Sequence, residues 1–307
     1  MKNAILLGAA LTAATVLASE TAERLKADTP EKPLTLAELA SAPRRPTTKV
    51  AVPGDTGVYI GSGVYKNLGQ MLMGGFCFTY WAPPTPTYDQ VLEMCLNEGV
   101  GNTLQFWQSN DLLLDLARKA KAKGLYATCI YSDATNGIPK KVMSELGPSW
   151  IGYDFGERFV FGLYDDWTGR GKTLTALAEN YMNRVHRHVA NLHAAGWGDV
   201  MATSGNFSLD YEVAAGVEIP CTEDASCDFV LFSGLDRGLY RQYDLPMWGS
   251  HLAHEWYSWI PHTNPYKMKT LETAFRLKYM AGSKMIINES GNWMLQSNLC
   301  PDSPMSK

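Results

Sequence analysis

Residues 101–131 read GNTLQFWQSNDLLLDLARKAKAKGLYATCIY, and this stretch decides the fold class. Gly101–Trp107 and Leu125–Tyr131 are short apolar runs, as expected of strands that are buried on both faces. Between them, Asp111–Lys123 has an amphipathic helical pattern and is followed by Gly124, a residue typical of helix C-caps. A strand, a helix and a second strand in this order predict parallel strands joined by a right-handed crossover.

The same alternation continues on both sides of this unit. The strand candidates are Met71–Tyr80, Gly101–Trp107, Leu125–Tyr131, Trp150–Phe155, Val200–Ser204, Val217–Thr222, Met247–His254 and Met285–Asn288. The helix candidates are Tyr88–Asn97, Asp111–Lys123, Thr173–Ala195, Ser226–Tyr243 and Lys267–Ala281, with short irregular helices expected after the third and fifth strands. Eight alternating strands predict an α/β fold of the (β/α)8 TIM barrel type.

Two features bear on how the barrel is completed. An open doubly wound sheet would carry a glycine-rich phosphate loop after its first strand, and Gly61-Ser62-Gly63 lacks the rest of that pattern. Only the residues after 288 remain for an eighth helix. We therefore expect that the barrel lacks its last helix through truncation, or that an N-terminal arm covers that flank.

The N-terminus has the pattern of a signal peptide. A basic start, Met1-Lys2-Asn3, precedes the apolar stretch Ala4–Ala18, which is too short to span a bilayer comfortably, and Val16-Leu17-Ala18 resembles a cleavage site. A buried core helix is the alternative interpretation. The predicted organisation is a signal peptide over 1–18, an arm or linker over 19–69 and a catalytic barrel over 70–307. A secreted or periplasmic bacterial protein is expected.

Composition limits the possible partners. The 307 residues carry a formal net charge of -4 and no basic run, which excludes a nucleic-acid partner. No segment after the N-terminus is long and apolar enough to span a membrane. Among the six cysteines, Cys221 and Cys227 are expected to form a local disulfide, whereas buried thiols are the alternative interpretation for Cys77 and Cys129.

Carboxylates recur at the ends of the predicted strands, where a barrel places its active site. These residues are Glu157, Glu223, Glu255, Glu289 and Asp133. Glycoside hydrolysis needs two carboxyl groups, one protonated to donate to the leaving oxygen and one ionised. Side chains expected to line the same cleft and bind a sugar are Trp107, Tyr131, His254, Trp256 and Trp293.

Each strand-end carboxylate also has a simpler interpretation. A single glutamate after a strand is most often a solvated loop residue or a charge at a helix N-terminus. This simpler interpretation suits Glu223, which precedes a predicted helix. It also suits Glu289, which lies in an Asn-Glu-Ser turn. It is weaker for Glu255, which is surrounded by His254 and Trp256.

Gly156-Glu157 and His254-Glu255-Trp256 resemble strand ends of clan A glycoside hydrolases, over roughly residues 70–295. The resemblance implies a retaining enzyme with Glu157 as acid/base and Glu255 as nucleophile, acting on an oligo- or polysaccharide. The residue before the strand-four glutamate is usually Asn in that family and is Gly156 here. The segment Met247–Trp293 also resembles uncharacterised secreted bacterial barrel proteins.

Two other functions remain open. One is a carbohydrate-binding barrel without catalysis. The other is a metal-dependent hydrolase or lyase on the same fold, since a fold does not fix chemistry. His251, His254 and a glutamate could provide metal ligands, but residues three apart on a strand point to opposite faces. We therefore expect no metal and no cofactor.

Overall fold

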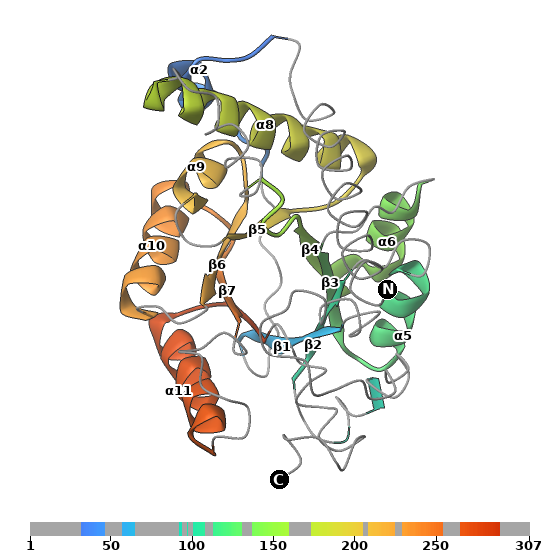
Figure 1. Ribbon diagram of the computed structural model, residues 1–307. Helices are drawn as coiled ribbons and strands as arrows, with labels where there is room; N and C mark the ends of the chain where they lie inside the picture. Colours follow the sequence, from blue (N-terminus) through green and yellow to red (C-terminus); the bar gives the residue numbers. More distant parts are fainter. Residues whose placement is uncertain are drawn as a thin grey trace, which may run out of the picture.

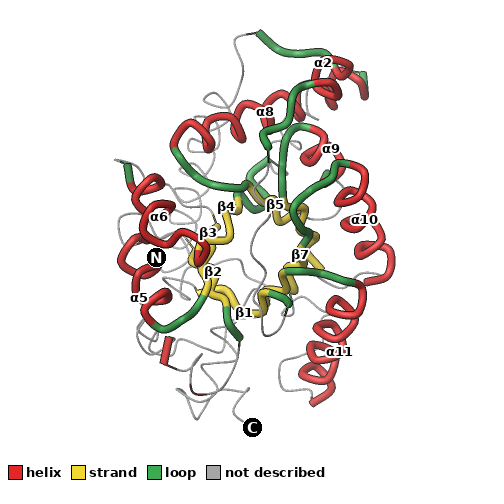
Figure 2. Tube along the Cα trace, turned by 180° about the vertical axis from the view of Figure 1, so that it is seen from behind, coloured by secondary structure: helices red, strands yellow, loops and turns green. Residues whose placement is uncertain are grey.

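The computed structural model describes residues 32–46, 57–64, 92–93, 97, 101–107, 113–130, 137–159, 173–204, 208–224, 229–253 and 265–288. In these ranges, eight parallel strands form a closed barrel in chain order, with β1 pairing both β2 and β8 (Figure 1). Helices surround the strands, as the view from behind also shows (Figure 2). The predicted (β/α)8 barrel is therefore confirmed.

The strands are β1 Tyr59–Val64, β2 Thr103–Trp107, β3 Tyr126–Ile130, β4 Trp150–Asp154, β5 Val200–Ser204, β6 Ile219–Asp224, β7 Gly249–Leu252 and β8 Met285–Asn288. The helices are α2 Leu36–Ser41, α5 Leu113–Ala122, α6 Ile138–Leu146, α8 Leu174–Ala195, α9 Leu209–Ala214, α10 Phe229–Gln242 and α11 Pro265–Ala281, with a 3-10 turn, η2, at Gly147–Ser149.

Seven strands match their predicted positions, and the first does not. The strand that closes the barrel is Tyr59–Val64, which lies in the segment expected to be the arm, and the predicted strand Met71–Tyr80 lies outside the described residues. The sequence of β1, YIGSGV, has two glycines and no continuous apolar run, so a search for apolar runs did not identify it as a strand. Residues 289–307 also lie outside the described ranges, so the expectation about the eighth helix stays a prediction.

Glycines end the long helices as expected. Gly124, Gly196 and Gly282 have φ values of 76°, 98° and 94°, the left-handed conformation that glycine adopts without a steric penalty. At the other end of α8, the Thr173 hydroxyl accepts a hydrogen bond from the amide of Ala176, a normal N-cap. Local sequence signals therefore set these helix boundaries.

Two apolar layers hold the barrel together. Alternate strand residues fill the interior, and the buried members are Tyr59, Ile151, Met201, Ile219, Cys221, Met247, Met285 and Ile287. The opposite faces of β2 to β5 pack against the surrounding helices in a larger cluster. Since strand side chains alternate, the interior set fixes which residues at the strand ends face the barrel axis.

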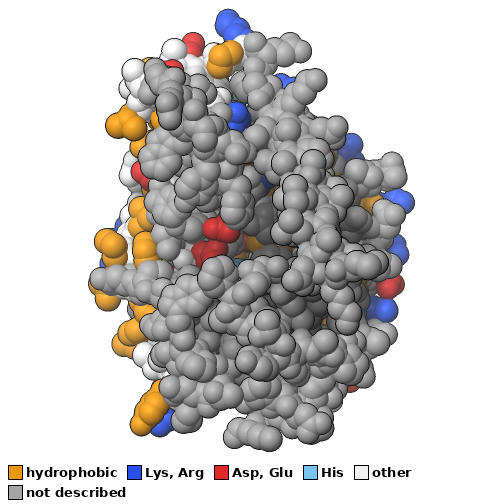
Figure 3. Space-filling view, in the orientation of Figure 1, with side chains coloured by type: hydrophobic (Ala, Val, Ile, Leu, Met, Phe, Trp, Pro, Cys, Tyr) orange, Lys and Arg blue, Asp and Glu red, His pale blue; other side chains and the backbone are white. Residues whose placement is uncertain are grey.

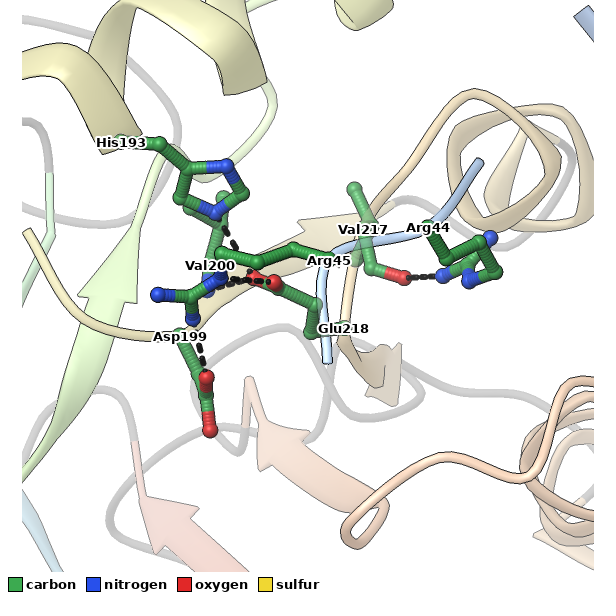
Figure 4. Close-up of polar contacts among 7 residues, drawn as sticks. All are labelled: Arg44, Arg45, His193, Asp199, Val200, Val217 and Glu218. Carbon is green, nitrogen blue, oxygen red and sulfur yellow. Dashed lines mark hydrogen bonds and ion pairs between the residues drawn. The ribbon is translucent and has the colours of Figure 1, made fainter. Parts of the chain in front are cut away.

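The N-terminal arm is fixed to the outside of the barrel. Here α2 lies beside α8 (Figure 1), and Asn183 of α8 both accepts from the amide and donates to the carbonyl of Leu34, at 2.7 Å each. Arg45 forms ion pairs with Asp199 and Glu218, and Glu218 also contacts His193 (Figure 4). Asp199 and Glu218 precede β5 and β6, so the arm is anchored at the N-terminal end of the barrel.

Three further expectations concern cysteines, membranes and export. Cys221 and Cys129 are free, buried thiols, so the expected Cys221–Cys227 disulfide was wrong because β6 turns Cys221 into the barrel interior. None of the helices in the described ranges is both long and apolar enough to cross a membrane. Residues 1–18 lie outside the described ranges, and the signal peptide stays a prediction.

Candidate active site

Polar side chains converge inside the barrel at the C-terminal ends of its strands. Gln105 and Asp154 come from β2 and β4, and Thr203 comes from β5. Glu223 and His251 follow the inward-facing Cys221 and Met247 at even spacing, so they also face the axis. This mouth is where barrels of this fold place their active sites.

Asp154 is the centre of this polar layer and is fully buried. Its Oδ1 accepts hydrogen bonds from the amides of Gly156 and Thr203, at 2.7 and 2.9 Å. Its Oδ2 accepts from the Thr203 hydroxyl at 2.5 Å and from Gln105 Nε2 at 3.1 Å. Four donors on two oxygens hold the carboxylate in one orientation.

The charge of Asp154 is balanced by its surroundings. Burial raises the pKa of Asp154 above its usual value, whereas the hydrogen bonds from Thr203 and Gly156 lower it, and so does the charge of His251. Asp154 and His251 therefore interact electrostatically across the barrel.

Glu223 and His251 are two titratable residues that face the mouth from neighbouring strands. They are register partners on the neighbouring strands β6 and β7, where adjacent backbones lie about 4.8 Å apart. His251 is buried, at 1% exposure, and Glu223 is half-buried. A carboxyl group that reaches solvent beside a buried imidazole is a suitable arrangement for moving protons.

A second charged cluster lies behind the mouth, between the barrel wall and the helices. Lys278 of α11 is completely buried, and its Nζ lies 2.8 Å from Oδ2 of Asp224 at the end of β6. Asp236 of α10 is also buried and accepts a hydrogen bond from the Thr222 hydroxyl at 2.6 Å. Burial raises the pKa of Asp224 to about 6 although Lys278 opposes this shift.

Behind β5 a further carboxyl group is enclosed by α8 and α9. Glu212 has no exposed surface and accepts hydrogen bonds from the Tyr181 hydroxyl at 2.5 Å and the Ser208 hydroxyl at 3.3 Å. Burial raises the pKa of Glu212 to about 7, and these hydrogen bonds only partly offset the shift.

Replacing Glu212 by glutamine should flatten the dependence of stability on pH. The folded pKa of about 7 lies above the reference value of 4.5, so the stabilising effect of the bound proton is complete below pH 4.5 and is lost as pH rises through 7. We expect the wild-type free energy of unfolding to fall from pH 5 to pH 8, and Glu212→Gln to remove about 2 kcal/mol of that fall.

Urea unfolding followed by circular dichroism at both pH values measures this difference. Asp210→Asn is the control, because Asp210 is exposed on the same helix, α9. An unchanged fall in the Glu212→Gln variant would contradict the expectation.

The structure describes only part of the predicted site. Glu157 is half-buried in the turn after β4, beyond the left-handed Gly156, and Glu223 is half-buried at the end of β6. Trp107 is the last residue of β2, and its side chain lies outside the described part of the structure. The remaining predicted residues, Tyr131, Asp133, His254, Glu255, Trp256, Glu289 and Trp293, lie outside the described residues.

Sequence reasoning passed over the polar residues inside the strands. Asp154 and Gln105 interrupt the apolar runs WIGYD and TLQFW, and an isolated polar residue in a buried strand is the signal that could have identified them. His251 was considered only as a metal ligand. Within the described residues, no three His, Cys, Asp or Glu side chains come together as a possible metal site.

Comparisons with known proteins assign no family. No family model and no curated protein matches the sequence. Similar solved structures include a putative fructose-1,6-biphosphate aldolase from Coccidioides immitis, with 13% identity, a TM-score of 0.42, and 81% and 82% of the two chains covered. An HpcH/HpaI aldolase from Desulfitobacterium hafniense has 11% identity, a TM-score of 0.41, and 80% and 91% covered. A phospho-2-dehydro-3-deoxyheptonate aldolase from Thermotoga maritima has 13% identity, a TM-score of 0.38, and 81% and 64% covered.

These findings correct the expected resemblance. The similar structures are aldolases and not glycoside hydrolases, so the clan A assignment and the glycosidase activity drawn from it were wrong. The retaining roles given to Glu157 and Glu255 depended on that family. At these identities and TM-scores no activity passes from the aldolases to this chain.

Proposed function

We propose that the chain is an enzyme that works by acid–base catalysis at the C-terminal mouth of the barrel, with His251 as the group that takes up and returns a proton. The observation that carries the proposal is the register pairing of His251 with Glu223, both facing the axis. Histidine is the side chain whose ordinary pKa suits proton transfer near neutral pH.

The other polar residues would support this pair. Asp154 is held by four hydrogen bonds, so its carboxyl group is fixed in orientation before the substrate arrives, ready to act as a negative charge. That charge stabilises the imidazolium of His251 after it accepts a proton. Glu223 is half-buried and connects the buried histidine with the substrate or solvent, to which it can pass the proton on.

This arrangement favours removal of a proton from a substrate carbon. That step begins many lyase and isomerase reactions. A buried imidazole beside a carboxyl group provides a base and an acid within one mouth. The proposal includes a secreted or periplasmic location, which is supported only by the apolar N-terminus.

Proton exchange tests the proposal because it detects carbon acid chemistry whatever product the enzyme forms. The protein would be incubated in D2O with hydroxy ketones, keto acids and hydroxy acids, with and without chelator, and loss of carbon-bound proton signals would be followed by NMR. At least one compound should exchange, and His251→Gln should slow its exchange by about 100- to 10,000-fold. Glu223→Gln should slow it too and alter its pH profile.

A matched control is His186→Gln, because His186 lies on α8 outside the barrel. Exchange by the His251→Gln variant at the wild-type rate would refute the role of the histidine. Absence of exchange and of any conversion across the whole panel would refute the proposal.

A further inference from the structure

A pocket of about 290 Å³ lies on the outside of the barrel, between the N-terminal arm, α8 and the turn after α9. Because α8 and α9 end shortly before β5 and β6 begin, this pocket lies near the N-terminal ends of those strands, away from the mouth. The acidic side chains visible in the central hollow (Figure 3) also lie apart from α8 and the arm, which are at the top of the same view (Figure 1). A ligand in this pocket would be separate from the proposed acid–base site.

Basic and small apolar side chains line the pocket together. The titratable residues in its described wall are Arg44, Arg45, His186 and His193, and none of the described lining residues is acidic. The others are alanines, a proline, a valine and a glycine. Positive charge and a smooth apolar surface therefore face one space.

Arg44 carries a charge that no carboxylate in the described ranges neutralises by direct contact. Its Nη1 and Nη2 donate to the carbonyls of Val213 and Val217, at 2.5 Å each, and Figure 4 shows the second of these bonds. Both acceptors are neutral, and the bonds use two of the five N–H donors of the guanidinium. Burial lowers the pKa of Arg44, whereas the nearby Glu218 and Tyr243 raise it. An anion placed beside Arg44 would stabilise its charged form.

Two carboxylates near the pocket are already occupied. Arg45 pairs with Asp199 and, through Nε, with Glu218 at 2.9 Å (Figure 4). The second oxygen of Glu218 lies 3.1 Å from His193 Nε2 and accepts from the amide of Val200 at 2.7 Å. Nη1 of Arg45 has no hydrogen-bond partner among the described residues, so Arg45 provides the pocket with a further donor.

Backbone carbonyls at the end of α9 would repel an anion, but three of them already have partners. Val213 and Val217 accept from Arg44, and the carbonyl oxygen of Ala215 lies 3.2 Å from Nδ1 of His186. The contact with Ala215 also accounts for His186. The two arginines are therefore the groups through which the pocket would bind an anion.

We infer that this pocket binds a small carboxylic acid in its ionised form, with the carboxylate against Arg44 and Arg45 and an apolar chain against the alanines and Val189. The planar guanidinium matches a carboxylate in both charge and geometry. The small lining residues leave room for an aliphatic chain, and burial of that chain adds to the affinity. Because the arginines belong to the arm and Val189 belongs to α8, the bound acid would also hold the arm on the barrel.

Four small probes separate the effect of charge from the effect of the chain. At pH 7, hexanoate, 1-hexanol and hexylamine are anionic, neutral and cationic with the same chain, and acetate keeps the carboxylate without the chain. Each would be titrated into the full chain at low salt and followed by saturation-transfer NMR. Hexanoate should bind at least about 10-fold more tightly than each of the other three. High salt should reduce its advantage over 1-hexanol.

Two variants test the location of the site. Ala190 lines the pocket on the exposed side of α8, so Ala190→Leu fills space without removing a charge and should weaken hexanoate binding by about 10-fold or more. Arg44→Met removes the charge and should weaken hexanoate binding by a similar factor of about 10 while leaving 1-hexanol binding unchanged. If Arg44→Met does not fold, because Arg44 also binds the end of α9, Ala190→Leu decides alone.

Matched controls for these variants are available on the same helix. Ala194→Leu and Arg187→Met change exposed residues of α8 that are not among the described lining residues, so both proteins should bind hexanoate like the wild type. His251→Gln, at the other end of the barrel, should do so too, and weaker binding by that variant would place the acid in the mouth instead.

The inference fails if 1-hexanol, hexylamine or acetate binds as tightly as hexanoate, or if none of the four probes binds. It also fails if hexanoate binding is unchanged in the Ala190→Leu protein or in a folded Arg44→Met protein.

Discussion

Replacing Lys278 by methionine is expected to destabilise the protein by about 3 to 5 kcal/mol at pH 8. Lys278 is completely buried, and its Nζ lies 2.8 Å from Asp224 Oδ2. Its charge also lowers the pKa of the neighbouring Asp236, which burial raises. Methionine fills a similar volume but leaves two carboxyl groups without their cation, and removing one partner of a buried ion pair is strongly destabilising.

The loss should shrink as the pH falls. Without Lys278 the pKa of Asp224 rises further above about 6, and below that value its carboxyl group becomes neutral and tolerates burial. Urea unfolding of both proteins at pH 5 and pH 8 measures the effect.

The control for Lys278→Met is Lys284→Met, since Lys284 is exposed, and it should change stability by less than about 0.5 kcal/mol. Adding Asp224→Leu to Lys278→Met should recover part of the loss, because it removes one of the two unpaired carboxyl groups. A Lys278→Met protein as stable as the wild type at pH 8 would show that this ion pair adds nothing to the fold.

Replacing Gly61 by alanine is expected to destabilise the protein by about 3 kcal/mol or more, because it separates β1 from β2. A Cβ atom at position 61 would lie 1.7 Å from the carbonyl oxygen of Thr103 on β2. The contact is with backbone, so no change of rotamer can relieve it. Gly101 has the same constraint, since a Cβ atom there would lie 2.2 Å from the carbonyl oxygen of Ile60.

Gly234→Ala provides the matched control for Gly61→Ala. Gly234 lies within α10, and a Cβ atom there would meet nothing within 4 Å, so alanine should stabilise the helix by about 0.5 to 1 kcal/mol. Urea unfolding and near-ultraviolet circular dichroism measure both variants. If the Gly61→Ala variant were as stable as the wild type, β1 and β2 could move apart without a loss of stability.

The barrel was predictable because its strands are buried on both faces. Runs such as Val200–Ser204 and Met285–Asn288 are buried throughout, and glycines with positive φ end the helices between them. β1 was not predictable in the same way. Gly61 is required by its close backbone contact with β2, and that requirement depends on a neighbour far along the chain.

The candidate site was predictable only at the level of position. The rule that strand ends carry the active site placed Glu223 and Glu157 near the mouth. It did not find Asp154 or Gln105, because their importance comes from contacts across the barrel, such as the 3.1 Å hydrogen bond between them. The family resemblance failed because it used two- and three-residue motifs, which recur by chance.

The pairing of β1 with β8 imposes an order on biosynthesis. Tyr59 and Ile60 pair with Met285 and Ile286, so the barrel cannot close until β8 has been made. At about 5 to 20 residues per second, β1 waits roughly 10 to 45 s for its second neighbour. Throughout that interval one edge of β1 offers unpaired amides and carbonyls to any other nascent chain. Protection of this edge by a chaperone would then matter more to the yield of native protein than the stability of the finished barrel.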